Sequence, residues 1–169
     1  MDIRYERTEE LIRNAVTELG KKKDIRSLTV TEIAKKARIS RIAFYDHYDN
    51  VDALADNLED EMVEDFIAVC GPFSDFTVSP DRIIRRVVNY YKTTGSSILV
   101  TPANHSHLSQ KSIDRIIHEI IEKTGNTDTR FEIRVTMLIT GIFGVFQRKD
   151  ITDEQILKDL CACADQIMK

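Results

Sequence analysis

Apolar positions along most of this chain recur every three to four residues, the spacing of a buried face on an α-helix. The first run extends from about residue 3 to residue 22, and in it Leu11, Ala15 and Leu19 repeat at i+4. Gly20 and the three lysines after it end the pattern. We therefore predict an amphipathic N-terminal helix.

Two shorter helical patterns follow between residues 29 and 45, separated by a tight polar break. Thr29 or Thr31 can cap the first and Ser40 the second, because a hydroxyl oxygen at a helix start accepts a bond from a free backbone N–H. Helix, short turn and short helix make the helix-turn-helix plan, in which the second helix can enter the major groove of DNA.

The rest of the chain is also helical in pattern. Further apolar-periodic segments cover about residues 50–70, 80–91, 111–123, 131–149 and 152–168. Between them, residues 95–109 are polar and broken by Pro102, which indicates a short helix or a loop. No alternation typical of β-strands and no internal repeat is evident. The sequence predicts an all-α fold.

The last two predicted helices are too apolar for a surface position. Gly141 and Gly144 interrupt the first of them and would allow another backbone to approach closely. Such helices lie at the centre of a larger bundle or pack against a second copy of the chain. An ordinary monomeric core is the alternative.

Composition narrows the class of protein. Of the 169 residues, 42% are hydrophobic and 31% charged, which is typical of a globular chain. No apolar stretch is long enough for a membrane span, and the N-terminus lacks a signal-peptide core. Three cysteines, an odd number, fit a reducing compartment. We expect a cytoplasmic protein.

Charge is distributed unevenly along the chain. The net charge of −4 alone argues against a nucleic-acid partner. Residues 19–45, however, carry eight basic and two acidic side chains, whereas residues 51–169 carry 13 basic and 19 acidic ones. A basic N-terminal segment on an acidic body is what attraction to phosphates at one end requires. A solvated lysine-rich turn with a chance asymmetry is the alternative.

The second short helix carries the side chains suited to reading DNA. Arg41 can donate two bonds to guanine, the commonest specific contact in the major groove. Ile42 and Ala43 can touch a thymine methyl group, and Tyr45 and His47 can donate to phosphates. The hydroxyls of Thr31 and Ser40 lie at helix starts and could contact phosphates, although each could equally be a plain helix cap.

Between residues 11 and 58 the order of residue types resembles the DNA-binding domain of the tetracycline-repressor (TetR) family of bacterial regulators. The resemblance rests on a Thr-Val start, Ile33-Ala34, Ala37, Ile39-Ser40, Phe44-Tyr45, His47-Tyr48 and Ala53-Leu54. Together with the helix caps, it implies the following DNA-binding residues: Thr29, Thr31, Ser40, Arg41, Ile42, Ala43, Tyr45 and His47.

The chain departs from the family pattern at four positions. Arg38 occupies the turn where glycine is usual, so we expect a left-handed or otherwise strained backbone there. Val51 replaces a lysine that commonly binds phosphate, and Ile42 replaces a small residue. Asp46 would lie beside phosphates, although a carboxylate can accept from cytosine. The differences bear on DNA affinity and sequence preference more than on the fold.

The resemblance also implies the domain plan. It implies a helix-turn-helix head over residues 1–49 and a helical ligand-binding and dimerisation body over residues 50–169, with 50–70 as a linker helix. The two C-terminal helices of each subunit would form a four-helix dimer interface. We assign that interface to Ile142, Val145, Phe146, Ile156, Leu160, Ala164 and Ile167. An effector cavity in the body would be lined by Tyr90, Tyr91, His105, His107, Phe131, Met137 and Phe143, each of which could instead be plain core.

No constellation of catalytic residues assembles in the sequence. It contains no phosphate-binding loop, nucleophile elbow, HExxH motif or spaced cysteine ligands, so we predict that the protein is not an enzyme and has no metal or cofactor. His105 and His107 have a metal-like spacing but fit a polar loop better. We expect a homodimeric transcription regulator of the repressor type that binds a palindromic operator and is released by a small-molecule effector. The alternative is a regulator that binds a protein partner, with weak or lost DNA binding.

Overall fold

The computed structural model describes residues 3–94, 110–146 and 154–168. These residues form helices joined by short connections, and no strand occurs among them. The prediction of an all-α chain is therefore confirmed, with helix ends close to those expected. Within the described ranges, no helix combines the length and apolarity that crossing a membrane requires.

The chain divides into two compact units, and the division falls inside one long helix. Residues 3–60 belong to the first unit, which we call the head, and the other described residues belong to the second, which we call the body. The head therefore includes the first half of the helix that the sequence assigns to a linker.

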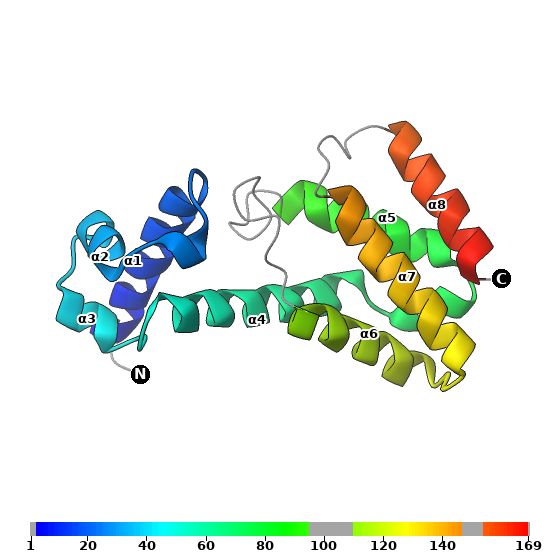
Figure 1. Cartoon of the computed structure of the whole chain (residues 1–169), viewed down its shortest axis with the longest axis horizontal. Coiled ribbons are helices and arrows are strands. Elements are labelled where there is room, and N and C mark those ends of the chain that lie inside the picture. Colours follow the sequence, from blue (N-terminus) through cyan, green and yellow to red (C-terminus); the bar gives the residue numbers. More distant parts are fainter. Residues whose placement is uncertain (1–2, 95–109, 147–153, 169) are drawn as a thin grey trace. The chain divides into compact units, whose positions relative to one another are not determined.

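The head contains α1 (Ile3–Gly20), α2 (Val30–Ala37), α3 (Arg41–Tyr45) and the start of α4 (Val51–Cys70). A 3-10 turn, η1 (Ile25–Ser27), connects α1 to α2 (Figure 1). The head has its own apolar core, centred on the fully buried side chains of Ile12, Val16, Ile33, Phe44 and Leu54. Because α2 and α3 are too short to persist alone, this core is what holds them in place.

Side-chain oxygens cap the starts of α2, α3 and α4, and the caps of α2 and α3 lie at positions that the sequence offers. The Thr29 hydroxyl accepts from the backbone N–H of Glu32, and the Glu32 carboxylate accepts from the backbone N–H of Thr29, which completes a capping box on α2. Ser40 accepts from the N–H of Ala43 at 3.0 Å and begins α3. Asn50 accepts from the N–H of Ala53 at 2.8 Å and begins α4.

The body consists of the rest of α4, the 3-10 turn η2 (Phe73–Thr77), α5 (Pro80–Thr94), α6 (Gln110–Thr124), α7 (Thr129–Phe146) and α8 (Glu154–Met168). Helix α5 packs on α8, while α6 packs on η2 and α7. Their apolar faces enclose a second core, around Phe76, Ile83, Ile84, Ile116 and Ile120. The body is thus a helical bundle with a core separate from that of the head.

Candidate DNA-binding surface

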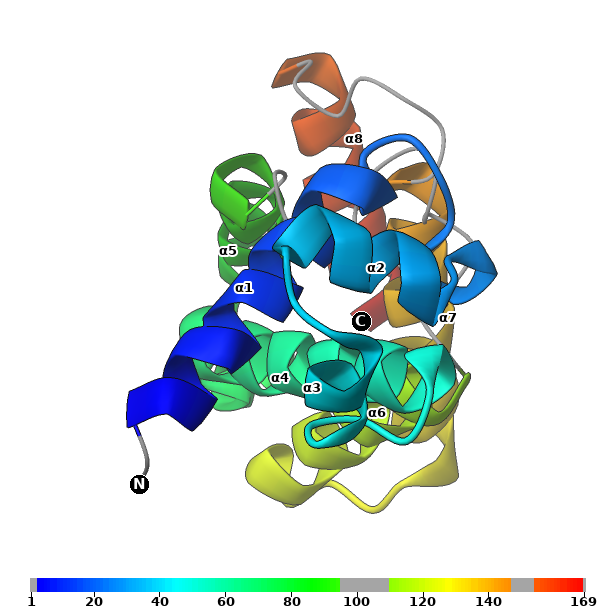
Figure 2. The ribbon, with the colours of Figure 1, turned by 90° about the vertical axis from the view of Figure 1, so that its left-hand side faces the viewer.

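Helix α3 divides sharply into a buried and an exposed side. Phe44 is completely buried in the head core, and Tyr48, just beyond the helix, is nearly so. Ile42 is 75% exposed and Tyr45 46% exposed, with Arg41 on the same outer side. Figure 2 shows α2 and α3 following one another on the side of the head that faces the viewer. The side chains expected to read bases are therefore free to reach a partner.

The side chain of Arg41 contacts that of Tyr45. Its Nη2 donates to the Tyr45 hydroxyl over 3.4 Å, and the guanidinium carbon lies 6.0 Å from the centre of the Tyr45 ring. A guanidinium on a ring face gains a modest cation–π attraction. This contact limits the freedom of Arg41 without burying its donors.

Two exposed cations lie at and just before the turn that leads into α3. Lys35 and Arg38 are exposed, and neither makes an ion pair with another residue that the structure describes. Other basic residues are partly neutralised within the head: Lys23 pairs with Glu32 at 3.1 Å, and Arg26 pairs with Asp56 at 2.7 Å. Lys35 and Arg38 thus leave positive charge available to a phosphate backbone near the turn between α2 and α3.

The turn between α2 and α3 has one of the backbone conformations that the sequence leaves open. Arg38 adopts φ 57° and ψ 41°, the left-handed conformation that usually favours glycine. Its backbone N–H donates to Ala34 and Lys35 and closes α2.

The valine at position 51, where the family pattern has a lysine, is explained by its place in the core. It is only 9% exposed and belongs to the head core, so it supports the fold and does not replace the phosphate contact of a lysine.

The expected hydroxyl contacts differ in how free they are. Thr31 is exposed, whereas the Thr29 hydroxyl both accepts from the Glu32 N–H and donates to the Glu32 carboxylate. Ser40 is exposed but caps α3, and Ala43 is half-buried beside it. Of these positions, Thr31 has the hydroxyl most available to DNA.

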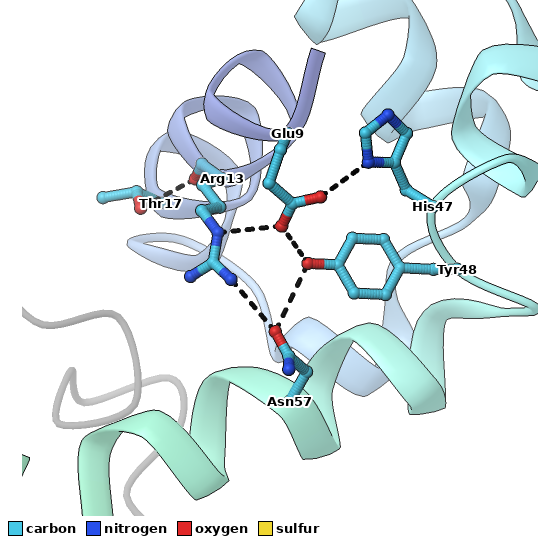
Figure 3. Close-up of polar contacts among 6 residues, drawn as sticks. All are labelled: Glu9, Arg13, Thr17, His47, Tyr48 and Asn57. Atoms are coloured by element: carbon cyan, nitrogen blue, oxygen red, sulfur yellow. Dashed lines mark hydrogen bonds and ion pairs between the residues drawn. The ribbon is translucent and has the colours of Figure 1, made fainter. Parts of the chain in front are cut away.

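His47 lies in a polar network that the sequence does not indicate (Figure 3). Its side chain is only 3% exposed, and Nδ1 lies 2.8 Å from the carboxylate of Glu9 on α1. The Glu9 carboxylate also accepts from the Tyr48 hydroxyl and, at 2.9 Å, from Nε of Arg13. Arg13 Nη2 in turn donates to Oδ1 of Asn57 on α4 at 3.0 Å. The network joins α1, the segment after α3 and α4.

Electrostatics keep Glu9 ionised. Burial opposes its ionisation, but hydrogen bonds from Tyr48, Arg13 and His47, with the charge of Arg13, outweigh that effect and hold the pKa of Glu9 below its ordinary value. Glu9 was not among the expected site residues, because on an amphipathic helix it reads as an ordinary surface acid.

The residues expected to line an effector cavity do not form one group. Tyr90 is buried and meets Phe66 edge-on with ring centres 5.5 Å apart, and Phe143 lies 6.2 Å from the same ring. Phe131 is buried in the body core, whereas Met137 is 59% exposed. His105, His107 and the side chain of Tyr91 lie outside the described part.

A hollow of about 260 Å³ occurs elsewhere in the body. It lies where α4 ends against η2 and α6, and none of the expected residues lines it. Its lining consists of Ile67, Gly71, Pro72, Phe73, Ser74, Glu119 and Lys123. In the described ranges, no group of three or more potential ligands could hold a metal ion.

The residues assigned to a dimer interface also separate. Ile142 and Ala164 are buried within their own chain, while Val145, Ile156, Leu160 and Ile167 are half-buried at the edge of the body core. The side chain of Phe146 is not described. The outer face of α7 instead presents Ile133, Met137 and Gly141, and a methyl group added at Gly141 or Gly144 would meet nothing within 4 Å.

Together, a capped helix-turn-helix in the head and a separate helical body define the fold of TetR-type transcription regulators. A crystal structure described as a TetR transcriptional regulator from Rhodococcus sp. RHA1 matches this chain with a TM-score of 0.60. The match covers 99% of this chain and 98% of that chain, at 15% sequence identity. No protein-family model matches the sequence, and no curated protein matches it. The resemblance to the TetR fold that the sequence predicts is thus confirmed over nearly the whole length.

Proposed function

We propose that the protein is a DNA-binding transcription regulator whose head reads the major groove with α3. The observation that carries the proposal is the exposed side of a well-anchored α3, which presents Arg41, Ile42 and Tyr45 and follows the exposed cations Lys35 and Arg38 along the chain. Phosphate attraction supplies most of the affinity, and base-edge contacts supply sequence preference. The matched solved structure, itself described as a transcriptional regulator, supports this reading.

Binding of the purified protein to DNA at several salt concentrations tests the proposal. The probes are the DNA upstream of its own gene and a duplex that the protein selects from a random-sequence pool. Arg41→Ala should lower the preference for the selected duplex over scrambled DNA by about 1–3 kcal/mol. Lys35→Ala, a matched exposed cation, should weaken both by a similar factor and reduce the salt slope by about one per head. Equal binding of selected and scrambled DNA by the wild type would refute the role of Arg41.

A regulator that acts through a protein partner is the second candidate. Two observations favour it: Asp46 places an exposed carboxylate directly after α3, and Val51 is buried where a cation would contact phosphate. Such a protein would show a shallow salt slope or no DNA binding, whereas the first proposal requires a steep one.

We further propose that the body forms a homodimer through the outer face of α7 and the adjoining edge of α8. The exposed apolar stripe of Ile133 and Met137 continues into Gly141 and Gly144, which would let a second helix approach closely. Ile156, Leu160 and Ile167 of α8 would extend the contact. Two heads would then bind half-sites of a palindrome, about 34–36 Å apart or a multiple of that spacing.

The mass of the protein in solution tests the dimer. Met137→Asp should shift the protein toward the monomer, because a carboxylate would be buried in the interface without a partner. Val78→Asp is the matched control, since Val78 is an 80% exposed apolar residue of the same unit outside α7 and α8. Loss of the dimer in both variants, or in neither, would contradict this interface.

The proposed repressor would be released by a small effector bound in the body. Tyr90 and Phe143 both lie against the ring of Phe66, and we propose that they line the effector site. The other residues proposed for it are Tyr91, His105 and His107. An effector lowers DNA affinity only if it binds the DNA-free arrangement better. A compound that raises the melting temperature should therefore weaken DNA binding, and one that stabilises the protein without that effect would argue against release.

A further inference from the structure

Arg41 and Tyr45 lie one helical turn apart on the exposed side of α3. Because they are four positions apart, their side chains share one strip of the helix surface. Nη2 of Arg41 donates to the Tyr45 hydroxyl over 3.4 Å, and the guanidinium carbon lies 6.0 Å from the centre of the Tyr45 ring. The contact joins two residues for which different DNA contacts are expected, a base edge for Arg41 and a phosphate for Tyr45.

The ring of Tyr45 is supported by the head core. Phe44 is completely buried, and its ring meets that of Tyr45 at 87° with centres 5.8 Å apart. This edge-to-face arrangement is one that aromatic rings favour. Tyr45 itself remains 46% exposed. Its ring therefore packs against the core, while its hydroxyl contacts the side chain of Arg41.

The bond between the two side chains uses the Tyr45 hydroxyl as an acceptor. A phenol oxygen can accept a hydrogen bond and donate its own proton at the same time. Because Arg41 supplies the proton of this bond, Tyr45 can still donate to a phosphate oxygen. A guanidinium has enough N–H groups to bond Tyr45 and to make a bidentate contact with guanine. The Tyr45 hydroxyl can thus bind Arg41 and a phosphate together.

We infer that Tyr45 is a positioning residue for Arg41, whose guanidinium it holds over the base while its hydroxyl donates to a phosphate. The inference rests on the proposed DNA-binding function and adds a residue that sets base preference through another side chain. A phosphate contact by itself carries no sequence information. Tyr45 gains an influence on sequence through Arg41, because a guanidinium already held in place loses less conformational freedom when it binds guanine.

The variant Tyr45→Phe tests the inference with two fixed duplexes, the one that the wild type selects and a scrambled one. Phenylalanine keeps the ring and its contact with Phe44 but removes the oxygen, and the charge of the head is unchanged. The ratio of affinities for the selected over the scrambled duplex, measured by fluorescence anisotropy, should fall on the order of threefold per head, as expected for one lost hydrogen bond. The salt dependence should match that of the wild type, because no cation is lost.

Thr31→Val is the matched control. Thr31 is exposed near the start of α2, and valine replaces its hydroxyl by a methyl group. Loss of a phosphate contact that supports no base-reading side chain should leave the ratio of affinities unchanged. If Tyr45→Phe also leaves the ratio unchanged, Tyr45 is a phosphate contact only and the inference is wrong. A ratio that rises in Tyr45→Phe would contradict it too, since Tyr45 would then hold Arg41 away from the base.

The double variant Arg41→Ala/Tyr45→Phe shows whether Tyr45 acts through Arg41. Once the guanidinium is removed, Tyr45 has nothing to position, so the double variant should have the same affinity ratio as Arg41→Ala alone. A further fall of the ratio in the double variant would mean that Tyr45 reads a base itself, and the inference would fail. A general loss of stability would weaken binding of both duplexes alike and would not change their ratio.

Nuclear magnetic resonance of the unbound protein separates this inference from the proposed function. The wild type should show nuclear Overhauser effects between the Arg41 side chain and the Tyr45 ring. The ¹⁵N relaxation of Arg41 Nε should report a less mobile side chain in the wild type than in Tyr45→Phe. Equal mobility in the two proteins would refute the positioning role whether or not the protein binds DNA, whereas absence of DNA binding by the wild type would refute the proposed function.

Discussion

Replacing Arg38 by glycine should stabilise the head, although it removes a side chain and adds backbone freedom. Arg38 has φ 57°, a left-handed conformation that costs a residue with a Cβ atom about 1–2 kcal/mol. Glycine lifts that cost but gains about 0.4–1 kcal/mol of additional freedom in the unfolded chain. The Arg38 side chain makes no ion pair among the described residues, and the backbone bonds to Ala34 and Lys35 do not depend on it. The free energy of unfolding of the head should rise by about 0.5–1 kcal/mol.

Lys35→Gly is the matched control, because Lys35 is an exposed cation of the same turn region but has helical backbone. Glycine inside a helix costs about 1 kcal/mol, so this variant should be destabilised while losing the same charge. Hydrogen exchange of the α2 and α3 amides, measured at increasing urea concentration, reports the free energy of unfolding of the head separately from that of the body. If both glycine variants shift stability in the same direction, the left-handed strain assigned to Arg38 is wrong.

Two other perturbations test the elements that hold α3. Phe44→Ala should lower the free energy of unfolding of the head by about 3–5 kcal/mol, because Phe44 is fully buried in the head core. Thermal unfolding followed by far-ultraviolet circular dichroism should then show the head melting before the body. Glu32→Gln tests the capping box: bonds from the Thr29 hydroxyl, the Thr29 backbone and Lys23 lower the pKa of Glu32 to about 2. A depressed pKa stabilises the fold above the ordinary value near 4.5 and loses that effect as the pH falls toward 2, so acid unfolding of the wild type should show a component over this window that Glu32→Gln lacks.

The helices could be predicted because their signals are local. Apolar spacing and capping residues act within one or two turns, so the sequence was sufficient to offer Thr29 or Thr31 as the cap of α2 and Ser40 as the cap of α3. The structure selects Thr29 and adds Glu32 as its partner in a capping box. A left-handed or otherwise strained turn at Arg38 follows from a departure from the family pattern, and the backbone there is left-handed. The role of Val51 as core was missed, because a valine at a helix start gives no sign of which unit it packs into.

Which face of a helix points outward was harder to predict than where the helix lies in the sequence. Helix α7 is apolar on nearly every side, so its sequence cannot say which face turns outward. Ile142 was assigned to a partner surface by hydrophobicity, yet it is buried within the body, whereas Ile133 and Met137 lie outside. The contact between Glu9 and His47 was out of reach for a different reason. The two residues are 38 positions apart, and each fits an ordinary local role on its own.

In α3, the side chains that stabilise the head differ from those that would determine which DNA sequence it binds. A five-residue helix has almost no stability of its own, so its position depends on Phe44, Tyr48 and the network around Glu9, all on its inner side. Arg41 and Ile42 on the outer side contribute little to that support. Exchanging both outer residues should therefore change which duplex the protein selects and leave the free energy of unfolding within about 0.5 kcal/mol of the wild-type value. Selection of the same duplex by such a variant would mean that α3 does not read the bases.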